Sequence, residues 1–153
     1  GVQDSFTLIQ NMKTTAVRFN ESARVANVLA TFLDNHPLVE KVYYPGLASH
    51  PGADIHAHQS TSAGAVFSFS LPSYEVAKVF VEAMQIPVFA VSLGGVESIL
   101  SYPAKMSHAA MEPEERAKRG ITDGLLRFSV GLENEHDLLE DFAQALEKAL
   151  QVK

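Results

Sequence analysis

The sequence predicts an α+β fold, in which one small, mostly antiparallel sheet carries helices packed on one face. Two kinds of hydrophobic periodicity predict this class. Apolar residues recur at three- and four-residue spacing in several segments, which is typical of helices with one buried face. In other segments apolar and polar residues alternate, which is typical of strands with one face in the core. The two kinds of segment are interleaved, and 153 residues are enough for one domain with a single core.

The N-terminal half is predicted to contain two helices and two strands. The helices cover residues 5–19 and 21–35, and the second ends before Pro37. A strand within residues 38–46 ends in a Pro-Gly turn, and a polar loop follows it. Residues 65–71 then alternate between apolar and polar side chains, so we expect a strand there.

The C-terminal half is predicted to contain three helices and two further strands. Ser73 is the expected N-cap of the first of these helices, and residues 87–92 form a strand that begins with a proline. Pro113 and Gly120 bracket a short helix. The last helix begins after Asn134, which is the expected N-cap, with acidic residues in the first turn.

The amino-acid composition and net charge indicate which binding partners and which cellular location are expected. Apolar residues make up 46% of the chain and charged residues 20%, as in ordinary globular proteins. The net charge is −6 and no basic cluster stands out, which disfavours nucleic acid and anionic membranes as partners. The longest uncharged apolar stretch, around residues 86–93, is too short to span a bilayer. There is no cysteine, which is compatible with a reducing cytosol, and we expect a cytoplasmic protein.

One charged residue stands in the middle of the predicted strand between Gly124 and Gly131. Arg127 is flanked by leucine and phenylalanine. Because a buried guanidinium without a partner is costly, Arg127 must reach water, a carboxylate of the protein or an anionic ligand. From the strand alone, a structural ion pair and a ligand carboxylate or phosphate both stay open.

Other polar residues give weaker indications. His56 and His58, with Asp54 nearby, could bind a metal, but zinc needs three or four convergent ligands, so a solvated loop is the simpler interpretation. His108 could line a cleft or serve a structural role. Residues 92–95, Ser-Leu-Gly-Gly, expose backbone N–H groups after a strand but lack the other residues of a nucleotide-binding loop. We therefore expect no metal site.

Several linked motifs go beyond general patterns. They are "SLGG-ES", "YPA-MSH", "PEER" and "GI-DGL-R-SVGLE" within residues 90–146, preceded by "DSFTLIQNMKTTAVR" and "VYYPGL-SHPG". With these motifs the chain resembles the C-terminal part of the cystathionine γ-lyase and γ-synthase family of pyridoxal-phosphate enzymes of cysteine and methionine metabolism. The sequence of these motifs is most similar to that of bacterial cystathionine γ/β-lyases. The resemblance implies the fold of the C-terminal domain of fold-type I pyridoxal-phosphate enzymes.

The resemblance also implies that residues 1–153 are the single small domain of a larger enzyme. The large domain of the family, with its Schiff-base lysine and phosphate site, would lie upstream of Gly1, and the missing initiator methionine suggests a processed or excised piece. No lysine of this chain follows the Ser-x-x-Lys or Ser-x-Lys turn of the family. We therefore expect no catalytic or cofactor-binding residue here, pyridoxal phosphate bound by the missing domain, and an inactive isolated segment.

Four residues match substrate-binding positions of the family. Arg127 matches the arginine that binds the α-carboxylate of the substrate, a task that suits its planar, two-pronged guanidinium. Ser92 matches the serine of the strand-end loop, and Leu93 follows it in the same loop. Val91 stands where several cystathionine-handling relatives have an acid, which leaves room for a broader C–S lyase.

The function implied is that of a substrate-carboxylate-binding domain in a C–S lyase of transsulfuration, acting by γ- or β-elimination of cystathionine. Alternatives within the family are cystathionine γ-synthase, O-acetylhomoserine sulfhydrylase and methionine γ-lyase. An alternative of another class is a non-catalytic α+β module that binds an amino acid. The expected partners are an amino-acid thioether such as cystathionine, the upstream large domain and the other subunits of a homotetramer.

Overall fold

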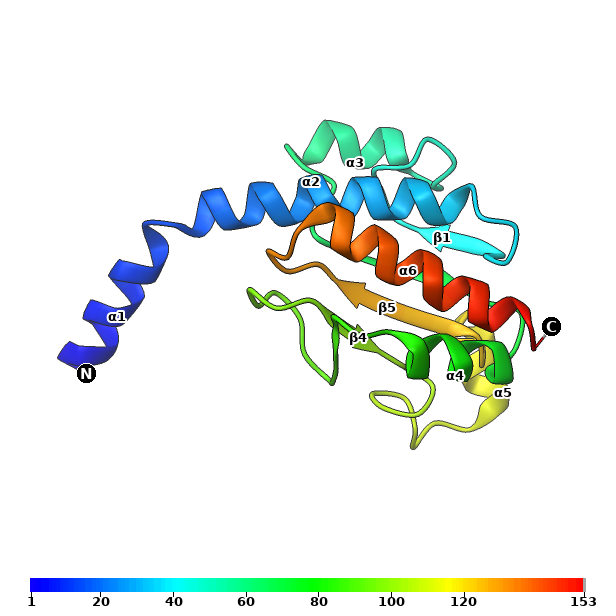
Figure 1. Ribbon diagram of the computed structural model, residues 1–153. Helices are drawn as coiled ribbons and strands as arrows, with labels where there is room; N and C mark the ends of the chain where they lie inside the picture. Colours follow the sequence, from blue (N-terminus) through cyan, green and yellow to red (C-terminus); the bar gives the residue numbers. More distant parts are fainter. Residues whose placement is uncertain (153) are drawn as a thin grey trace.

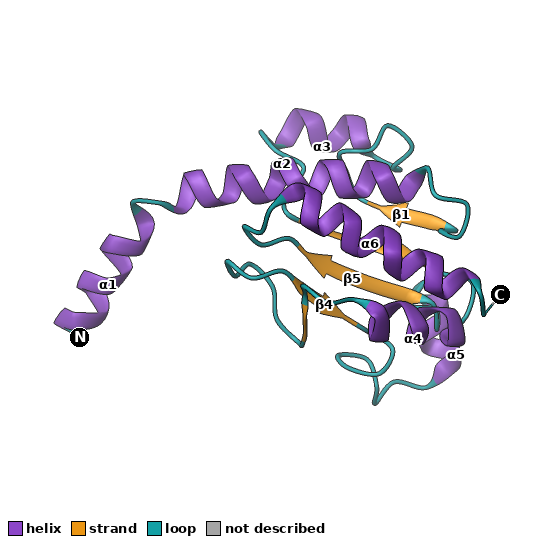
Figure 2. Cartoon of the chain, viewed as in Figure 1, coloured by secondary structure: helices purple, strands orange, loops and turns teal. Residues whose placement is uncertain are grey.

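A five-stranded sheet forms the centre of the protein, which a computed structural model describes for residues 1–152 (Figures 1 and 2). The strands are β1 (Lys41–Tyr43), β2 (Val66–Ser70), β3 (Val88–Phe89), β4 (Ile99–Ser101) and β5 (Leu125–Ser129). Their order is β1-β2-β5-β4-β3, and every neighbouring pair is antiparallel except β3 and β4, which are parallel. The predicted α+β class with a mostly antiparallel sheet is confirmed.

Three helices cover one face of this sheet and enclose the core. The helices of the chain are α1 (Val2–Met12), α2 (Thr15–Asp34), α3 (Ala53–Gln59), α4 (Tyr74–Ala83), α5 (Pro113–Lys118) and α6 (Glu135–Leu150). In Figure 1, α2, α4 and α6 lie side by side in front of the strands. Phe128 of β5 and Phe142 of α6 meet edge to face with ring centroids 4.9 Å apart. Aromatic packing of this kind accounts for the burial of the sheet on its helix side.

The boundary between the first two helices differs from the prediction. A helix was expected over residues 5–19, but α1 ends at Met12 and α2 begins at Thr15, so the break falls at Lys13 and Thr14. No side chain of α1 is buried among the residues described. The spacing of apolar residues therefore does not predict where α1 ends, because no other element within residues 1–152 packs against the apolar residues of α1.

Two other predictions were wrong in the middle of the chain. The polar loop after residue 46 contains the short helix α3, which buries no residue and so shows no apolar stripe. The strand expected over residues 87–92 is only two residues long, and β4 was not predicted at all. Strands of two or three residues are too short to show an alternating pattern.

The predicted helix ends are confirmed where a side chain caps the backbone. The hydroxyl of Ser73 accepts a hydrogen bond from the Val76 amide (3.3 Å), and the side-chain oxygen of Asn134 accepts one from the His136 amide (2.8 Å). The short helix α5 lies between Pro113 and Gly120 as expected. Within residues 1–152, no helix combines the length and the apolarity that crossing a bilayer requires.

Candidate functional site

Arg127 lies on the face of the sheet opposite the packed helices. Strand alternation directs its neighbours Leu126 and Phe128, both fully buried, into the core beneath those helices. In the ladder Arg127 stands between Ser68 of β2 and Ser101 of β4. The guanidinium is therefore half-buried among polar residues and lies outside the hydrophobic core.

The guanidinium is held through one of its nitrogens. Nη2 donates to the carbonyl oxygen of Ser92 (3.0 Å) and to the hydroxyl of Ser101 (3.1 Å). The Nε atom is buried and has no hydrogen-bond partner in residues 1–152. Over the same residues Arg127 forms no ion pair with a carboxylate. Since a buried donor without an acceptor costs about 1–3 kcal/mol, this arrangement favours an acceptor that does not belong to residues 1–152.

The loop that follows β3 carries the other predicted substrate-binding residues. Ser92 is brought to Arg127 across 35 positions of sequence, and the contact is made by its backbone carbonyl. Val91 and Leu93 flank it with side chains 65% and 56% exposed. The structure thus brings Arg127 and Ser92 together and leaves the two aliphatic side chains open to solvent within the described part of the chain.

Hydrogen bonds from β5 and the following turn fix this loop. The hydroxyl of Ser129 accepts from the Gly94 amide (2.9 Å), where a φ of +79° favours glycine. Further along, Ser98 donates its amide and its hydroxyl to the carboxylate of Glu133 (2.6 and 2.7 Å). The loop is therefore attached near its middle, at Gly94, and at its end, at Ser98.

Gly131 permits this attachment. Its amide donates to the Ser98 hydroxyl (2.9 Å), and a Cβ at this position would lie 2.4 Å from the carbonyl oxygen of Val96. Any side chain at Gly131 would push the loop away from the end of β5.

Sequence reasoning missed the serines that surround Arg127. Ser129 follows Arg127 by two residues in the same strand, so alternation could have placed it on the same face. Ser101 had no such signal, because β4 was not predicted and only strand pairing brings it opposite Arg127.

The other candidates do not form sites in the structure. His56 and His58 lie on the helix α3, where residues two apart point in different directions. His56 contacts the carbonyl of Ser62 (3.0 Å), and His58 contacts that of Asp54 (2.7 Å). His108 contacts the neighbouring Ser107 hydroxyl. No cluster of three or more potential metal ligands occurs among residues 1–152.

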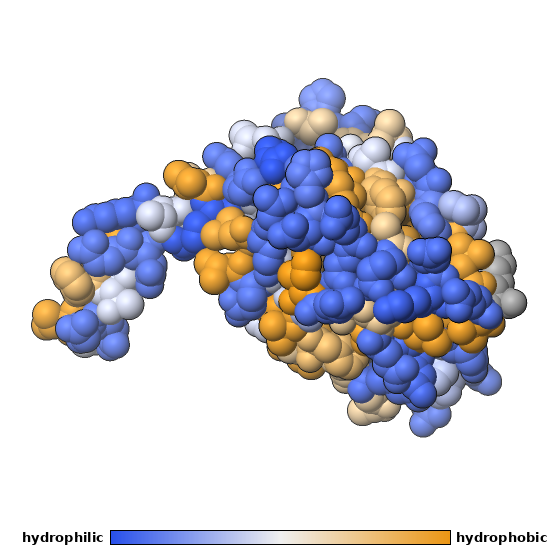
Figure 3. Space-filling model, in the orientation of Figure 1, coloured by the Kyte–Doolittle hydropathy of each residue, from blue (hydrophilic) through white to orange (hydrophobic). Residues whose placement is uncertain are grey.

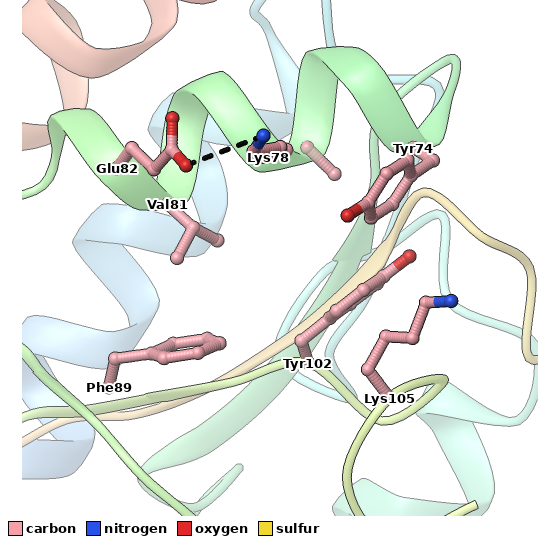
Figure 4. A pocket seen from close by; sticks show the side chains of 8 residues that line it. Tyr74, Lys78, Val81, Glu82, Phe89, Tyr102 and Lys105 are labelled. Atoms are coloured by element: carbon pink, nitrogen blue, oxygen red, sulfur yellow. Dashed lines mark ion pairs between the residues drawn. The ribbon is translucent and has the colours of Figure 1, made fainter. Parts of the chain in front are cut away.

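A separate apolar groove of about 460 Å³ lies between α4 and the β3–β4 edge of the sheet (Figure 4). Figure 4 shows Tyr74 and Val81 of α4 above Tyr102 and Phe89. Tyr102 donates its hydroxyl to the carbonyl of Asp123 (2.6 Å), and burial raises its pKa to about 12. None of the groove's lining residues takes part in the Arg127 contacts.

The fold and the site define a small α+β domain in which one arginine is held at a strand-end loop and keeps a buried N–H group without an acceptor in residues 1–152. Residues 1–147 match the family model described as "Cys/Met metabolism PLP-dependent enzyme". The chain belongs to this family, and the resemblance seen in its motifs is confirmed.

Two curated relatives of Bacillus subtilis illustrate the similarity. The chain is 60% identical over 148 residues to cystathionine beta-lyase MetC, and 44% identical over 147 residues to cystathionine gamma-lyase. These alignments cover 97% and 96% of this chain but only 38% and 39% of the relatives. The chain thus spans less than half the length of the enzymes that it matches.

Solved structures of longer relatives contain the same fold. Cystathionine gamma synthase from Xanthomonas oryzae pv. oryzae in complex with cystathionine matches with a TM-score of 0.92 at 41% identity. Cystathionine gamma-lyase from Lactobacillus plantarum complexed with L-serine matches with a TM-score of 0.90 at 38% identity. The matches cover 98% and 97% of this chain and 39% of each neighbour.

The described residues do not fit a complete site for pyridoxal phosphate. Every lysine of residues 1–152 is exposed. Lys78 and Lys105, which line the groove, lie with it on the helix-covered side of the sheet, whereas Arg127 faces the opposite side. The contacts of Arg127 within residues 1–152 include no lysine, so they offer groups for an anionic ligand but no amine that could hold the cofactor by a covalent bond.

Proposed function

We propose that this chain is the substrate-carboxylate-binding domain of a pyridoxal-phosphate-dependent C–S lyase, and that Arg127 binds the α-carboxylate of a thioether amino acid such as cystathionine. The observation that supports this most is the hydrogen bonding of the Arg127 guanidinium. Nη2 is held by Ser92 and Ser101, whereas the buried Nε has no acceptor within residues 1–152. A carboxylate is the acceptor that such a planar, charged group suits best.

The role of Arg127 in this proposal is positioning. A carboxylate bound at Arg127 fixes the adjacent Cα of the substrate relative to the reacting groups, which lowers the entropic part of the barrier. We assign those reacting groups, the cofactor and its lysine to a part of the parent enzyme outside residues 1–153. The isolated segment would then bind substrate weakly and catalyse nothing.

The preferred reaction is β- or γ-elimination of cystathionine. The 60% identity to a cystathionine beta-lyase supports this choice over the 43% identity to an L-methionine gamma-lyase of Fusobacterium nucleatum. Val91, which offers no charge to a distal amino group, supports a broader range of thioether substrates. Cystathionine γ-synthase and O-acetylhomoserine sulfhydrylase remain the alternatives within the family.

Further partners follow from the same proposal. We infer an upstream large domain, assembly of the full-length enzyme into a homotetramer, and a cytoplasmic location. A non-catalytic amino-acid-binding module would use the same arginine, but membership of an enzyme family favours the lyase.

The test is substitution of Arg127 in the full-length enzyme. Arg127→Ala should raise KM for cystathionine and lower kcat, with a fall in kcat/KM of about 10- to 100-fold or more, because charge-assisted hydrogen bonds contribute roughly 1.5–3 kcal/mol each. Arg127→Lys should recover little of this loss, since a lysine is a point charge on a flexible stem.

Arg119→Ala is the matched control, because Arg119 is exposed and, within residues 1–152, pairs only with Glu115, four residues earlier. An unchanged kcat/KM for Arg127→Ala would contradict the proposal, whereas a loss shared equally by Arg119→Ala would point to a general electrostatic effect.

A further inference from the structure

Ser101 is the one side chain that donates to or accepts from Arg127 among the residues described. It lies directly opposite Arg127 in the β4–β5 ladder and is only 3% exposed. Its hydroxyl donates to the carbonyl of Ala90 (2.8 Å) and accepts from Nη2 of Arg127 (3.1 Å). Because the single hydroxyl proton is directed at Ala90, the lone pairs of the oxygen are left to face the guanidinium.

The two groups that hold Nη2 differ in rigidity. Ser92 contributes a backbone carbonyl from an exposed loop, whereas Ser101 contributes a hydroxyl from a buried strand. The Ala90 carbonyl, which the same hydroxyl contacts, comes directly after β3 and before the loop. Ser101 thus connects, through its hydroxyl, the guanidinium of Arg127 and the start of the loop that carries Ser92.

The two N–H groups of Nη2 match the two acceptors. The N–H groups of Nε and Nη1 are left, and because they lie on different edges of the planar guanidinium, a carboxylate accepts from one of these two nitrogens at a time. An arginine side chain has many rotamers, and fixing one nitrogen in advance reduces the conformational freedom that a ligand must remove. A hydroxyl at position 101 therefore orients the guanidinium before substrate arrives.

We propose that Ser101 is a positioning residue, which holds Nη2 of Arg127 so that a remaining N–H group of the guanidinium meets the substrate carboxylate. This inference rests on the proposed function of Arg127. It assigns a role in carboxylate recognition to a residue that does not itself touch the substrate.

The experiment uses the full-length holoenzyme with Ser101→Ala, and Ser68→Ala as the matched control. Ser68 also stands opposite Arg127, on the neighbouring strand β2, but makes no hydrogen bond to it among the described residues. We expect Ser101→Ala to raise KM for cystathionine about 10-fold, as the loss of one charge-assisted hydrogen bond predicts, with a smaller change in kcat. Ser68→Ala should leave both constants within about 2-fold.

Two competitive inhibitors distinguish positioning from a general structural effect. L-alanine carries a carboxylate and ethylamine does not. Ser101→Ala should weaken inhibition by L-alanine about 10-fold and leave ethylamine unchanged. In the Arg127→Ala background, Ser101→Ala should cause no further weakening for L-alanine, because the two residues act as one unit.

A second pair of variants keeps the test valid if Ser101→Ala folds poorly. Ser101→Thr and Ser101→Val add nearly the same bulk, but only threonine keeps a hydroxyl. Threonine should retain most of the affinity for L-alanine and valine should not.

The possible failures are distinguishable. If Arg127→Ala leaves L-alanine inhibition unchanged, the proposed function of Arg127 is wrong. If Arg127→Ala weakens it but Ser101→Ala does not, or if L-alanine and ethylamine weaken together, only the role of Ser101 is wrong.

Discussion

At the scale of single residues, Arg127 shows how an arginine can occupy a central strand without an ion pair. Alternation places it on the polar side of the sheet, and Nη2 is shared between a carbonyl and a hydroxyl. No carboxylate compensates its charge within residues 1–152. Groups retained for a ligand commonly add little to the stability of the fold that carries them.

Arg127→Ala should therefore change the stability of the isolated segment very little. The two hydrogen bonds that are lost and the unsatisfied Nε that is removed act in opposite directions, so we expect a change within about 1 kcal/mol. A denaturant melt measures it, with Leu126→Ala on the core side as the reference, expected to cost about 2–5 kcal/mol. A cost above about 2 kcal/mol for Arg127→Ala would show that the arginine has mainly a structural role.

His36 should make the fold sensitive to mild acid. Burial lowers the pKa of its imidazole below the ordinary value, and its Nδ1 accepts from the Leu38 amide (3.2 Å). Because the unfolded chain then binds a proton more readily than the folded one, stability is retained above the ordinary histidine pKa and lost as the pH falls below it. The loss should appear between about pH 7 and pH 5.

The comparison is with His36→Asn, which keeps a neutral acceptor for the Leu38 amide at every pH. Its unfolding free energy, from urea melts at several pH values, should fall less steeply with acid than that of the unmodified segment. Parallel curves for the two proteins would exclude His36 as a source of the pH dependence.

At the scale of elements, α6 anchors the connection between α4 and β3. The carboxylate of Asp141, 5% exposed, accepts from the amides of Gln85 (3.0 Å) and Ile86 (2.9 Å). These backbone groups lie where the chain leaves α4 and enters the sheet. One side chain of the last helix therefore replaces the helical hydrogen bonds that this connection cannot make.

Asp141→Ala should destabilise the segment by about 2–3 kcal/mol, because two backbone N–H groups lose their acceptor. Asp141→Asn keeps one acceptor oxygen and should cost less. Glu140→Ala, next in the helix and exposed, is the control and should stay within about 0.5 kcal/mol. Thermal or urea melts of the three variants provide the measurement, and equal costs for Asp141→Ala and Glu140→Ala would contradict this assignment.

At the scale of the whole molecule, α1 projects away from the packed body of the protein (Figure 1). Val2, Phe6 and Ile9 share one of its faces and are exposed, and apolar atoms are visible along it in Figure 3. Longer relatives contain this fold, and the matches cover 97–98% of the present chain. We therefore expect this face to be covered by another part of the parent enzyme, and the isolated segment to be mainly monomeric or weakly self-associating.

Replacing Phe6 and Ile9 together by serine should leave the melting temperature of the isolated segment unchanged within about 2 °C, because neither residue is buried. The same change should reduce binding of an apolar dye and any self-association seen by sedimentation. A clear loss of melting temperature would show that α1 packs on the body in solution.

The isolated segment should also lack a specific site for pyridoxal phosphate. Every lysine of residues 1–152 is exposed, so we expect only weak labelling spread over several lysines. Absorption spectra after mixing and gel filtration test this. A stoichiometric visible band that disappears when one particular lysine is replaced would place the cofactor site in this segment.

Family membership and the position of Arg127 within a strand could be predicted without a structure, because both depend on local motifs. A charged residue between leucine and phenylalanine is visible in the strand itself. The caps at Ser73 and Asn134 were equally predictable, since a cap contacts amides only two or three residues away. Long helices with a buried face were found for the same reason.

The arrangement around Arg127 depended on tertiary structure. Ser101 lies 26 positions and Ser92 lies 35 positions from it in sequence, and each reaches it only through strand pairing or loop closure. The elements that sequence reasoning missed, α3 and β4, are short. The C-terminal end of α1 was predicted at the wrong residue, and α1 has no buried residue that could have marked it. The sequence by itself determined the family, the fold class and the position of Arg127 in a strand, because these depend on local patterns. Only the tertiary structure decided what holds that arginine, because the register between distant strands is set by packing of the whole core.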